Sequence, residues 1–110
     1  MKVRRGDVIY LQEDKMIPAK NHIQGGARPY VVVSNDKGNL YSEQCMIVPL
    51  TTNIYKRPLP THTIISYNNS LCMCEQVFTI SQNDVSKIKC TLSDKDMDDI
   101  SKCLMIALGC

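Results

Sequence analysis

The sequence predicts a small, mostly β (α+β) fold: a β-barrel or sandwich with one C-terminal helix laid against it. Two observations predict it. Several short segments rich in apolar and β-branched residues are separated by turns and polar loops, which is typical of small β folds. The last segment instead repeats apolar residues at helical spacing. At 110 residues, the chain is predicted to form a single domain, 1–110.

The first half of the chain contains three apolar segments that are predicted strands: 7–11, 29–34 and 45–50. The second of them, Pro-Tyr-Val-Val-Val-Ser, gives the strongest signal because β-branched side chains favour strands. Pro49 predicts that the third strand ends there or lies at an edge. Residues 12–27 are predicted to form a polar loop, and 35–39 a turn or loop. A loop as long as 12–27 is often functional in a small domain.

The second half begins with another polar loop, 51–60. Three short strands are predicted to follow, with a turn at 67–70: 61–65, 71–74 and 76–80. Ser93 is expected to cap a helix whose acidic first turns suit the positive end of the helix dipole. Gly109 is expected to close this helix. One face of the helix is apolar and is predicted to pack on the strands: Met97, Ile100, Leu104 and Ala107 or Leu108.

Charge is unevenly distributed along the chain, although the net charge is only +2. Residues 1–62 carry a charge of +4, and residues 63–110 carry −2. The basic half could face an anionic partner, and a mixed solvated surface is at least as good an interpretation of the charges alone. With 44% hydrophobic and 22% charged residues, the composition is that of a globular chain and not of a disordered one.

The six cysteines are expected to be reduced thiols in a cytoplasmic protein. No apolar segment follows the basic residues at the start, so no secretory signal is predicted, and no apolar run is long enough to span a membrane. Thiols stay reduced in the cytosol. The sequence contains no CxxC pair, so it does not indicate a zinc site. Cys72 and Cys74 would share one strand face and are expected to be small buried residues.

Four segments, read in order, resemble the MazF/PemK toxin family of type II toxin–antitoxin systems. They are Arg5-Gly6-Asp7-Val8, then Gln24-Gly25-Gly26-Ala27-Arg28-Pro29 with the strand up to Asn35-Asp36, then Val48-Pro49-Leu50-Thr51 running to Leu59-Pro60-Thr61-His62, and finally Cys74-Glu75-Gln76 leading to Thr79-Ile80. Each motif is weak alone, and their order and spacing over nearly the whole chain carry the resemblance. It implies an SH3-like small β-barrel with a C-terminal helix.

The resemblance also implies a function, that of a sequence-specific endoribonuclease, or mRNA interferase toxin. Members of this family cut single-stranded RNA without a metal ion or other cofactor. The 2′-OH of the RNA attacks the neighbouring phosphorus and leaves a 2′,3′-cyclic phosphate and a 5′-OH. The toxins are homodimers, and a cognate antitoxin blocks the RNA groove. Operator DNA is expected as a partner only through the antitoxin complex, and no membrane partner is expected.

Two residues match the catalytic positions of that family. The guanidinium of Arg28 matches phosphate geometry and stays charged, so its expected role is to stabilise charge in the transition state. The hydroxyl of Thr51 can hydrogen-bond a phosphate oxygen or help to move a proton, and Thr52 is close enough to leave an off-by-one placement open. His22 is a third candidate, because imidazole titrates near neutral pH. An exposed loop histidine is an equally good interpretation of His22.

A larger set of residues is predicted to contact the RNA. Gln76 could read a base edge, and Glu75 could accept from an amino group or orient Arg28. Lys56 and Arg57 could contact phosphates or lie on a solvated loop. The predicted RNA-binding residues are Gln24, Asn35, Thr52, Lys56, Arg57, His62, Glu75 and Gln76.

Some of these residues have structural alternatives, and the sequence departs from its relatives at two positions. Asn35 could contact bases or make a local turn with Asp36, and His62 could be structural or contact the substrate. Met73 stands where some relatives have an arginine two residues before the acid, and Phe78 where an arginine often precedes Thr-Ile. These departures bear on the preferred cut motif more than on activity.

Two other functions are compatible with parts of the sequence. A non-enzymatic toxin that binds DNA gyrase, as in the CcdB branch of the same fold, is not expected to share the Arg28 and Thr51 pair, and the chain lacks a tryptophan-containing tail. A thiol enzyme that uses Cys45 with His62 rests on residue types alone. Cleavage of a long RNA in EDTA separates these three functions.

Overall fold

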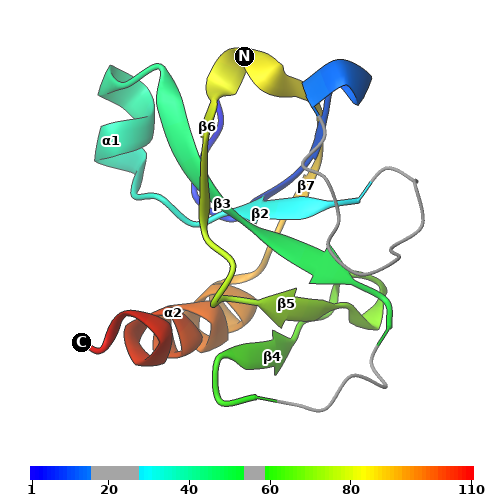
Figure 1. The fold of residues 1–110 in the computed structure, drawn as a ribbon, viewed down its shortest axis with the longest axis vertical. Coiled ribbons are helices and arrows are strands. Elements are labelled where there is room, and N and C mark those ends of the chain that lie inside the picture. The colour runs from blue at the N-terminus through cyan, green and yellow to red at the C-terminus, as the bar shows by residue number, and fades with distance from the viewer. Residues whose placement is uncertain (16–27, 54–58) are drawn as a thin grey trace.

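The computed structural model of the chain describes residues 1–15, 28–53 and 59–110 (Figure 1). The strands in these ranges are β1 (Asp7–Leu11), β2 (Tyr30–Val32), β3 (Gln44–Thr51), β4 (His62–Ile64), β5 (Leu71–Met73), β6 (Phe78–Ser81) and β7 (Val85–Thr91). The helices are α1 (Asp36–Tyr41) and α2 (Asp94–Leu108), with short 3-10 turns at Glu13–Lys15, Tyr67–Asn69 and Gln82–Asp84. None of these helices is long and apolar enough to cross a membrane.

The strands form one antiparallel sheet in the order β4-β5-β3-β2-β1-β7, and β6 also pairs with β3. β3 is long and crosses the fold, pairing with β6 along its first half and with β5 at its end (Figure 1). α2 lies beside β4 and β5 at the lower end of Figure 1. A mostly β fold with a C-terminal helix was predicted and is confirmed. Within the described residues the pairing path is open, with β4 and β7 at its ends, so "barrel" describes the sheet only loosely.

Pro49 corrects one expectation, because β3 neither ends nor lies at an edge there. β3 continues to Thr51, with β2 on one side and β6 or β5 on the other. The N–H of Leu50 donates to the carbonyl of Pro29, the residue just before β2. The nitrogen of Pro49, one residue earlier in β3, therefore points to the opposite side of the strand. On that side the partner changes from β6, last paired at Ile47, to β5, first paired at Leu50. The missing donor of the proline falls in this gap.

Apolar side chains are buried on both faces of the sheet. Alternation along β2 and β3 sends Val31 and Val48 towards α2, and Tyr30, Val32 and Ile47 towards the other face. The cluster under α2 also includes residues of the helix itself: Met97, Ile100 and Cys103. The sheet is therefore buried on both faces. Because side chains alternate along each strand, the face of each polar residue at a strand end follows from its position in the strand.

The predicted signals at both ends of α2 are confirmed. The Ser93 hydroxyl accepts a hydrogen bond from the Asp96 N–H at 3.2 Å, and Gly109 adopts a left-handed φ of 75°. The Asp96 carboxylate also accepts from the N–H and hydroxyl of Ser66, which ties the start of the helix to the β4–β5 connection. The buried helix face holds for its first turns only, because Leu108 is 65% exposed.

Two elements differ from the sequence-based expectation. α1 replaces the turn predicted at 35–39: Asn35 caps it, and it lacks an apolar stripe that would have indicated a helix. β7 was missed, because only its first residue, Val85, is buried and the rest of the strand is exposed. β7 pairs with β1 along its length, so hydrogen bonding rather than side-chain burial defines this strand.

Candidate active site

Pairing of β2 with β3 brings Arg28 and Thr51 together. The Leu50 N–H donates to the Pro29 carbonyl at 3.0 Å, in line with the antiparallel register of the two strands. Continued by one residue, this register sets Arg28 opposite Thr51. Both residues are half-buried. The pair therefore lies where β2 begins and β3 ends, and each of its residues is partly accessible.

Local contacts orient the two side chains. The Thr51 hydroxyl oxygen accepts a hydrogen bond from the Asn53 N–H at 3.1 Å, which leaves the hydroxyl proton to donate elsewhere. Arg28 lies close enough to Tyr30 to act on it electrostatically. Burial raises the pKa of the Tyr30 phenol, and the positive charge of Arg28 partly counters that rise. The site thus combines a cation with a hydroxyl donor.

The pleat of the sheet puts His62 on the same face as Thr51. Leu50 of β3 pairs with Cys72 of β5, and both side chains pack under α2. Their neighbours Thr51 and Met73 therefore point to the opposite face. His62 of β4 pairs with Met73 and shares that face. The residues that meet here come from three strands.

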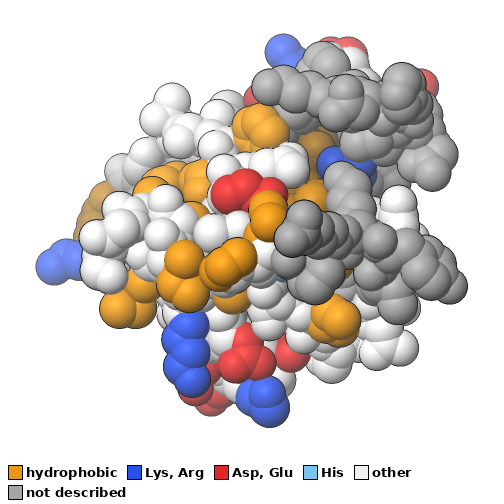
Figure 2. Space-filling view, turned by 60° about the horizontal axis from the view of Figure 1, so that its bottom comes forward, with side chains coloured by type: hydrophobic (Ala, Val, Ile, Leu, Met, Phe, Trp, Pro, Cys, Tyr) orange, Lys and Arg blue, Asp and Glu red, His pale blue; other side chains and the backbone are white. Residues whose placement is uncertain are grey.

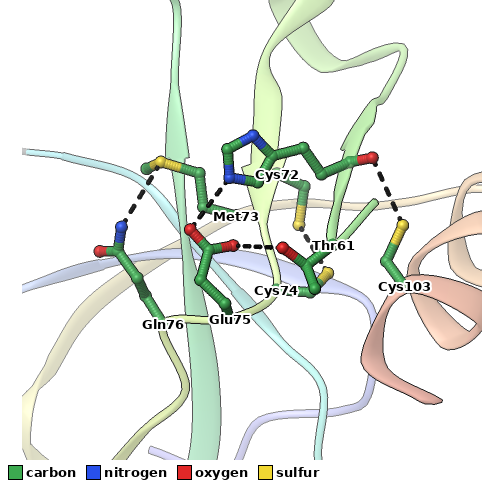
Figure 3. Close-up of polar contacts among 8 residues, drawn as sticks. Thr61, Cys72, Met73, Cys74, Glu75, Gln76 and Cys103 are labelled. Carbon is green, nitrogen blue, oxygen red and sulfur yellow. Dashed lines mark hydrogen bonds and ion pairs between the residues drawn. The ribbon is translucent and has the colours of Figure 1, made fainter. Parts of the chain in front are cut away.

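Thr61, His62 and Glu75 form a hydrogen-bonded group between β4 and the turn after β5 (Figure 3). His62 Nε2 lies 2.9 Å from Glu75 Oε2, and the Thr61 hydroxyl donates to Glu75 Oε1 at 3.0 Å. The backbone supports this arrangement, because the Cys74 N–H donates to the Thr61 carbonyl at 3.0 Å. The His62 side chain is 5% exposed and that of Glu75 is 32% exposed. The acid is thus the outer member of the group.

Glu75 is held in its ionised form. Partial burial raises the pKa of this carboxyl, but hydrogen bonds from His62, the backbone and Thr61 outweigh burial, so the pKa lies below its ordinary value. An ionised carboxylate only accepts hydrogen bonds, so Nε2 of His62 carries the proton between them. Nδ1 of His62 is buried and has no partner among the described residues.

Gln76 stands next to this group, and its side chain has one weak hydrogen-bond partner among the described residues. Its backbone N–H closes a tight turn on the Met73 carbonyl at 3.1 Å. Its side-chain Nε2 lies 3.7 Å from the Met73 sulfur, a weak acceptor (Figure 3). The half-buried amide is therefore suited to hydrogen-bond a ligand on this face.

Comparison with known families decides what kind of protein carries this site. Residues 4–108 match the family model described as "PemK-like, MazF-like toxin of type II toxin-antitoxin system". The chain belongs to this family. A curated relative, Endoribonuclease MazF of Staphylococcus saprophyticus, is 35% identical over 113 residues, which cover 97% of this chain and 92% of the relative.

Solved structures support the fold of this PemK/MazF-family chain. An endoribonuclease from a mycobacterial species, solved in complex with its cognate antitoxin, superposes with a TM-score of 0.78 at 22% identity, covering 97% of this chain and 95% of that one. MazF from Deinococcus radiodurans gives a TM-score of 0.77 at 16% identity, covering 100% and 99%. At these identities the likeness concerns the fold.

Of the remaining predicted site residues of this PemK/MazF-family chain, one lies apart from the Arg28 and Thr51 pair, one is the neighbour of Thr51, and four fall outside the described ranges. Asn35 uses its side chain to cap α1, accepting from the Gly38 N–H at 3.1 Å, and α1 leads into the opposite end of β3. Thr52 is exposed beside Thr51. Four candidates lie outside the described residues: His22, Gln24, Lys56 and Arg57.

The cysteines of this family member behave as small buried residues where the sequence predicted it. Cys72 and Cys74 are fully buried, with their sulfurs 3.8 Å apart. Cys45 is buried on the other side of the sheet, and burial raises the pKa of its thiol to about 11, so it is no nucleophile at neutral pH. Over residues 1–15, 28–53 and 59–110, no group of three His, Cys, Asp or Glu is placed to hold a metal ion.

Two residues of the site were not singled out by sequence reasoning. Thr61 precedes His62 directly, but only the β4–β5 register shows that both reach Glu75. Tyr30 was read as part of an apolar strand, and its closeness to Arg28 follows from the two-residue spacing between them, which puts both side chains on one face of an extended chain. The Thr61-His62 pair, thirteen residues before Glu75, is a sequence signal for Thr61. Tyr30 has no such signal.

Proposed function

We propose that the protein cleaves single-stranded RNA at a short sequence motif, using the RNA's own 2′-OH as the nucleophile and no metal ion. Attack on the neighbouring phosphorus expels the 5′ oxygen and leaves a 2′,3′-cyclic phosphate and a 5′-OH. The observation that carries the proposal is the β2–β3 register, which sets Arg28 opposite Thr51 in a PemK/MazF-family chain.

The protein is an endoribonuclease toxin. It belongs to a family of toxins, and the S. saprophyticus relative that aligns with 97% of this chain is named an endoribonuclease. The gyrase-binding alternative is not favoured by these matches. Because RNA is its substrate, the protein is expected to act in the cytoplasm.

Arg28 is proposed to stabilise the negative charge that develops on the phosphorane oxygens. A guanidinium offers paired N–H donors that match two phosphate oxygens. Its position at the open end of β2 leaves the group half-exposed and able to meet a phosphate. His22 lies outside the described residues and is proposed as a proton donor or acceptor on the basis of its chemistry alone.

Thr51 is proposed to hydrogen-bond a phosphate oxygen through its hydroxyl proton. Thr51→Val keeps the shape of the side chain and removes the hydroxyl, so we expect a clear loss of RNA cleavage, smaller than that from removing Arg28. Initial rates on a defined RNA measure it. Thr52→Val is the matched control, because Thr52 is exposed next to Thr51. Loss in Thr52→Val with none in Thr51→Val would show that the register of the assignment is wrong.

The other predicted contacts are proposed to bind RNA, with Asn35 lying apart from this pair at the other end of β3. Gln76, whose amide has one weak partner among the described residues, is the best placed to read a base edge. Lys56 and Arg57 are proposed to contact phosphates. The full proposed set is Gln24, Asn35, Thr52, Lys56, Arg57, His62, Glu75 and Gln76.

We also propose that the toxin is a homodimer. Figure 2 turns the end of the fold that holds α2 and β4 forward and shows hydrophobic side chains on this face, with one group of charged side chains at its lower edge. Large exposed apolar residues on these elements are Ile64, Met105, Ile106 and Leu108. Such a patch supports contact with a second chain. Sedimentation velocity at micromolar concentration should show a dimer, and a fully active monomer would rule this out.

A cognate antitoxin is proposed to bind where RNA binds, and operator DNA is expected to be reached only through that complex. The basic excess of residues 1–62 attracts an acidic peptide by the same charges that attract phosphate. Lys56→Glu with Arg57→Glu should therefore weaken both RNA and antitoxin binding, by about tenfold or more at low salt. Lys89→Glu with Lys102→Glu, both exposed, is the control. Weaker antitoxin binding with unchanged RNA cleavage would place the antitoxin on another surface.

The function itself is tested with purified protein, a long RNA and EDTA, beside a DNA gyrase supercoiling assay. We expect RNA cleavage at recurring short motifs in EDTA and no effect on gyrase. Intact RNA together with inhibited gyrase would support the non-enzymatic alternative and contradict the proposed function.

A further inference from the structure

Building on the proposed endoribonuclease function, we propose that Glu75 is a fixed hydrogen-bond acceptor for the exocyclic amino group of one substrate base, and that Thr61 and His62 are the positioning residues that hold it. Glu75 would then determine which base is accepted at one position near the cut. This assignment concerns the choice of base and not the chemistry of cleavage.

The geometry leaves the carboxylate both fixed and available. Two side-chain donors bind the carboxylate, the Thr61 hydroxyl at Oε1 (3.0 Å) and His62 Nε2 at Oε2 (2.9 Å), and the backbone N–H of Glu75 adds a further hydrogen bond. A carboxylate has about four acceptor sites, so it can still accept a hydrogen bond from a ligand. The side chain remains 32% exposed, whereas His62 beneath it is 5% exposed. The remaining acceptor capacity therefore belongs to the more exposed residue of the group.

Burying His62 costs free energy, and what this burial provides is a carboxylate held in one place. We take that cost as a sign that the fixed carboxylate has a function. His62 is buried with only one of its ring nitrogens hydrogen-bonded by described residues, and an unsatisfied buried acceptor costs about 1–3 kcal/mol. An apolar side chain would pack there without that cost. The hydrogen bond that the imidazole does make is the one that orients Glu75. The role of His62 is thus to hold the Glu75 carboxylate in place.

The charge of Glu75 decides what it can bind. A carboxylate on a face that binds RNA repels phosphate and base carbonyl oxygens, so a favourable contact must come from an N–H donor. Adenine, cytosine and guanine present exocyclic amino groups, whereas the N3–H of uracil lies between two carbonyl oxygens, which the carboxylate repels. A carboxylate whose two oxygens are held in place therefore selects for an amino-bearing base and rejects uracil at that position.

The test uses the full-length protein and short RNAs that contain its mapped cut site. Each base near the cut is replaced singly by its counterpart without the amino group: purine riboside for adenosine, inosine for guanosine and pyrimidin-2-one riboside for cytidine. We expect one position at which the wild type loses about ten- to hundredfold in kcat/KM when the amino group is removed. This ratio between the paired substrates is the readout, so it is insensitive to the amount of folded enzyme.

Variants of Glu75 and His62 test whether the preference for the amino group comes from the Glu75 carboxylate. Glu75→Ala should bring the ratio at that position close to one, and Glu75→Gln, which keeps the size of the side chain, should lower it as well. His62→Phe keeps the ring but removes the hydrogen bond, and should lower the ratio through KM rather than kcat. Glu43→Ala removes an equally charged, exposed residue that precedes β3 and should leave the ratio unchanged.

The outcomes separate this inference from the function on which it rests. A wild type that cleaves no RNA would remove the endoribonuclease proposal, and the inference with it, before any variant is made. A wild type that cleaves RNA without an amino-dependent position would overturn the inference alone. So would Glu75 variants that keep the wild-type ratio while cleaving every substrate more slowly, because that result assigns Glu75 a general structural role.

Discussion

Arg28→Ala is expected to reduce RNA cleavage on the order of a hundredfold or more, because it removes a cation that contacts the developing phosphorane charge. The fold should survive the change. Arg28 precedes β2, is half-buried, and its guanidinium donates no hydrogen bond to a described residue. Single-turnover rates on an RNA with one cut site measure the loss, and thermal unfolding of the same sample measures stability.

A matched charge change elsewhere controls for electrostatic attraction alone. Arg4 is exposed and precedes β1, so Arg4→Ala removes the same charge away from the β2–β3 pair. We expect Arg4→Ala to retain most of the wild-type rate. A soluble Arg28→Ala protein with near wild-type cleavage would exclude Arg28 from the catalytic group, and equal losses in the two variants would reduce its role to general attraction of RNA.

The elements predicted from sequence were those in which burial produces a recognisable pattern of apolar residues along the chain. β2 is a run of β-branched residues buried on both faces, and α2 carries a serine cap, an apolar stripe in its first turns and a terminal glycine. β7 carries no such pattern, because its side chains after Val85 are exposed and backbone pairing with β1 holds it. Pro49 misled because a strand can change partners, so a missing N–H is tolerated within a sheet.

The site was predictable as a set of residue types and not as an arrangement. Family resemblance pointed to Arg28 and Thr51, but only the register of β2 with β3 sets them opposite each other. Glu75 and His62 were candidates for separate contacts with RNA. Their hydrogen bond depends on β4 pairing with β5, which sequence spacing does not specify.

Replacing the ribose 5′ to the cut by 2′-deoxyribose is expected to abolish cleavage at that bond. In the proposed mechanism this 2′-OH is the nucleophile, and no protein group or bound water substitutes for it. The substitution leaves the base, the phosphate charge and the protein unchanged. Binding of the modified RNA should therefore persist, and the modified RNA should compete with unmodified substrate.

This substitution is also the most direct test of the central claim, that the protein is an endoribonuclease that uses the hydroxyl of its own substrate. The account predicts an intact bond at the deoxy position, with cleavage in EDTA continuing at other sites to give 2′,3′-cyclic phosphate and 5′-OH ends. Continued cleavage at the deoxy-substituted bond, or 5′-phosphate ends at the others, would contradict it.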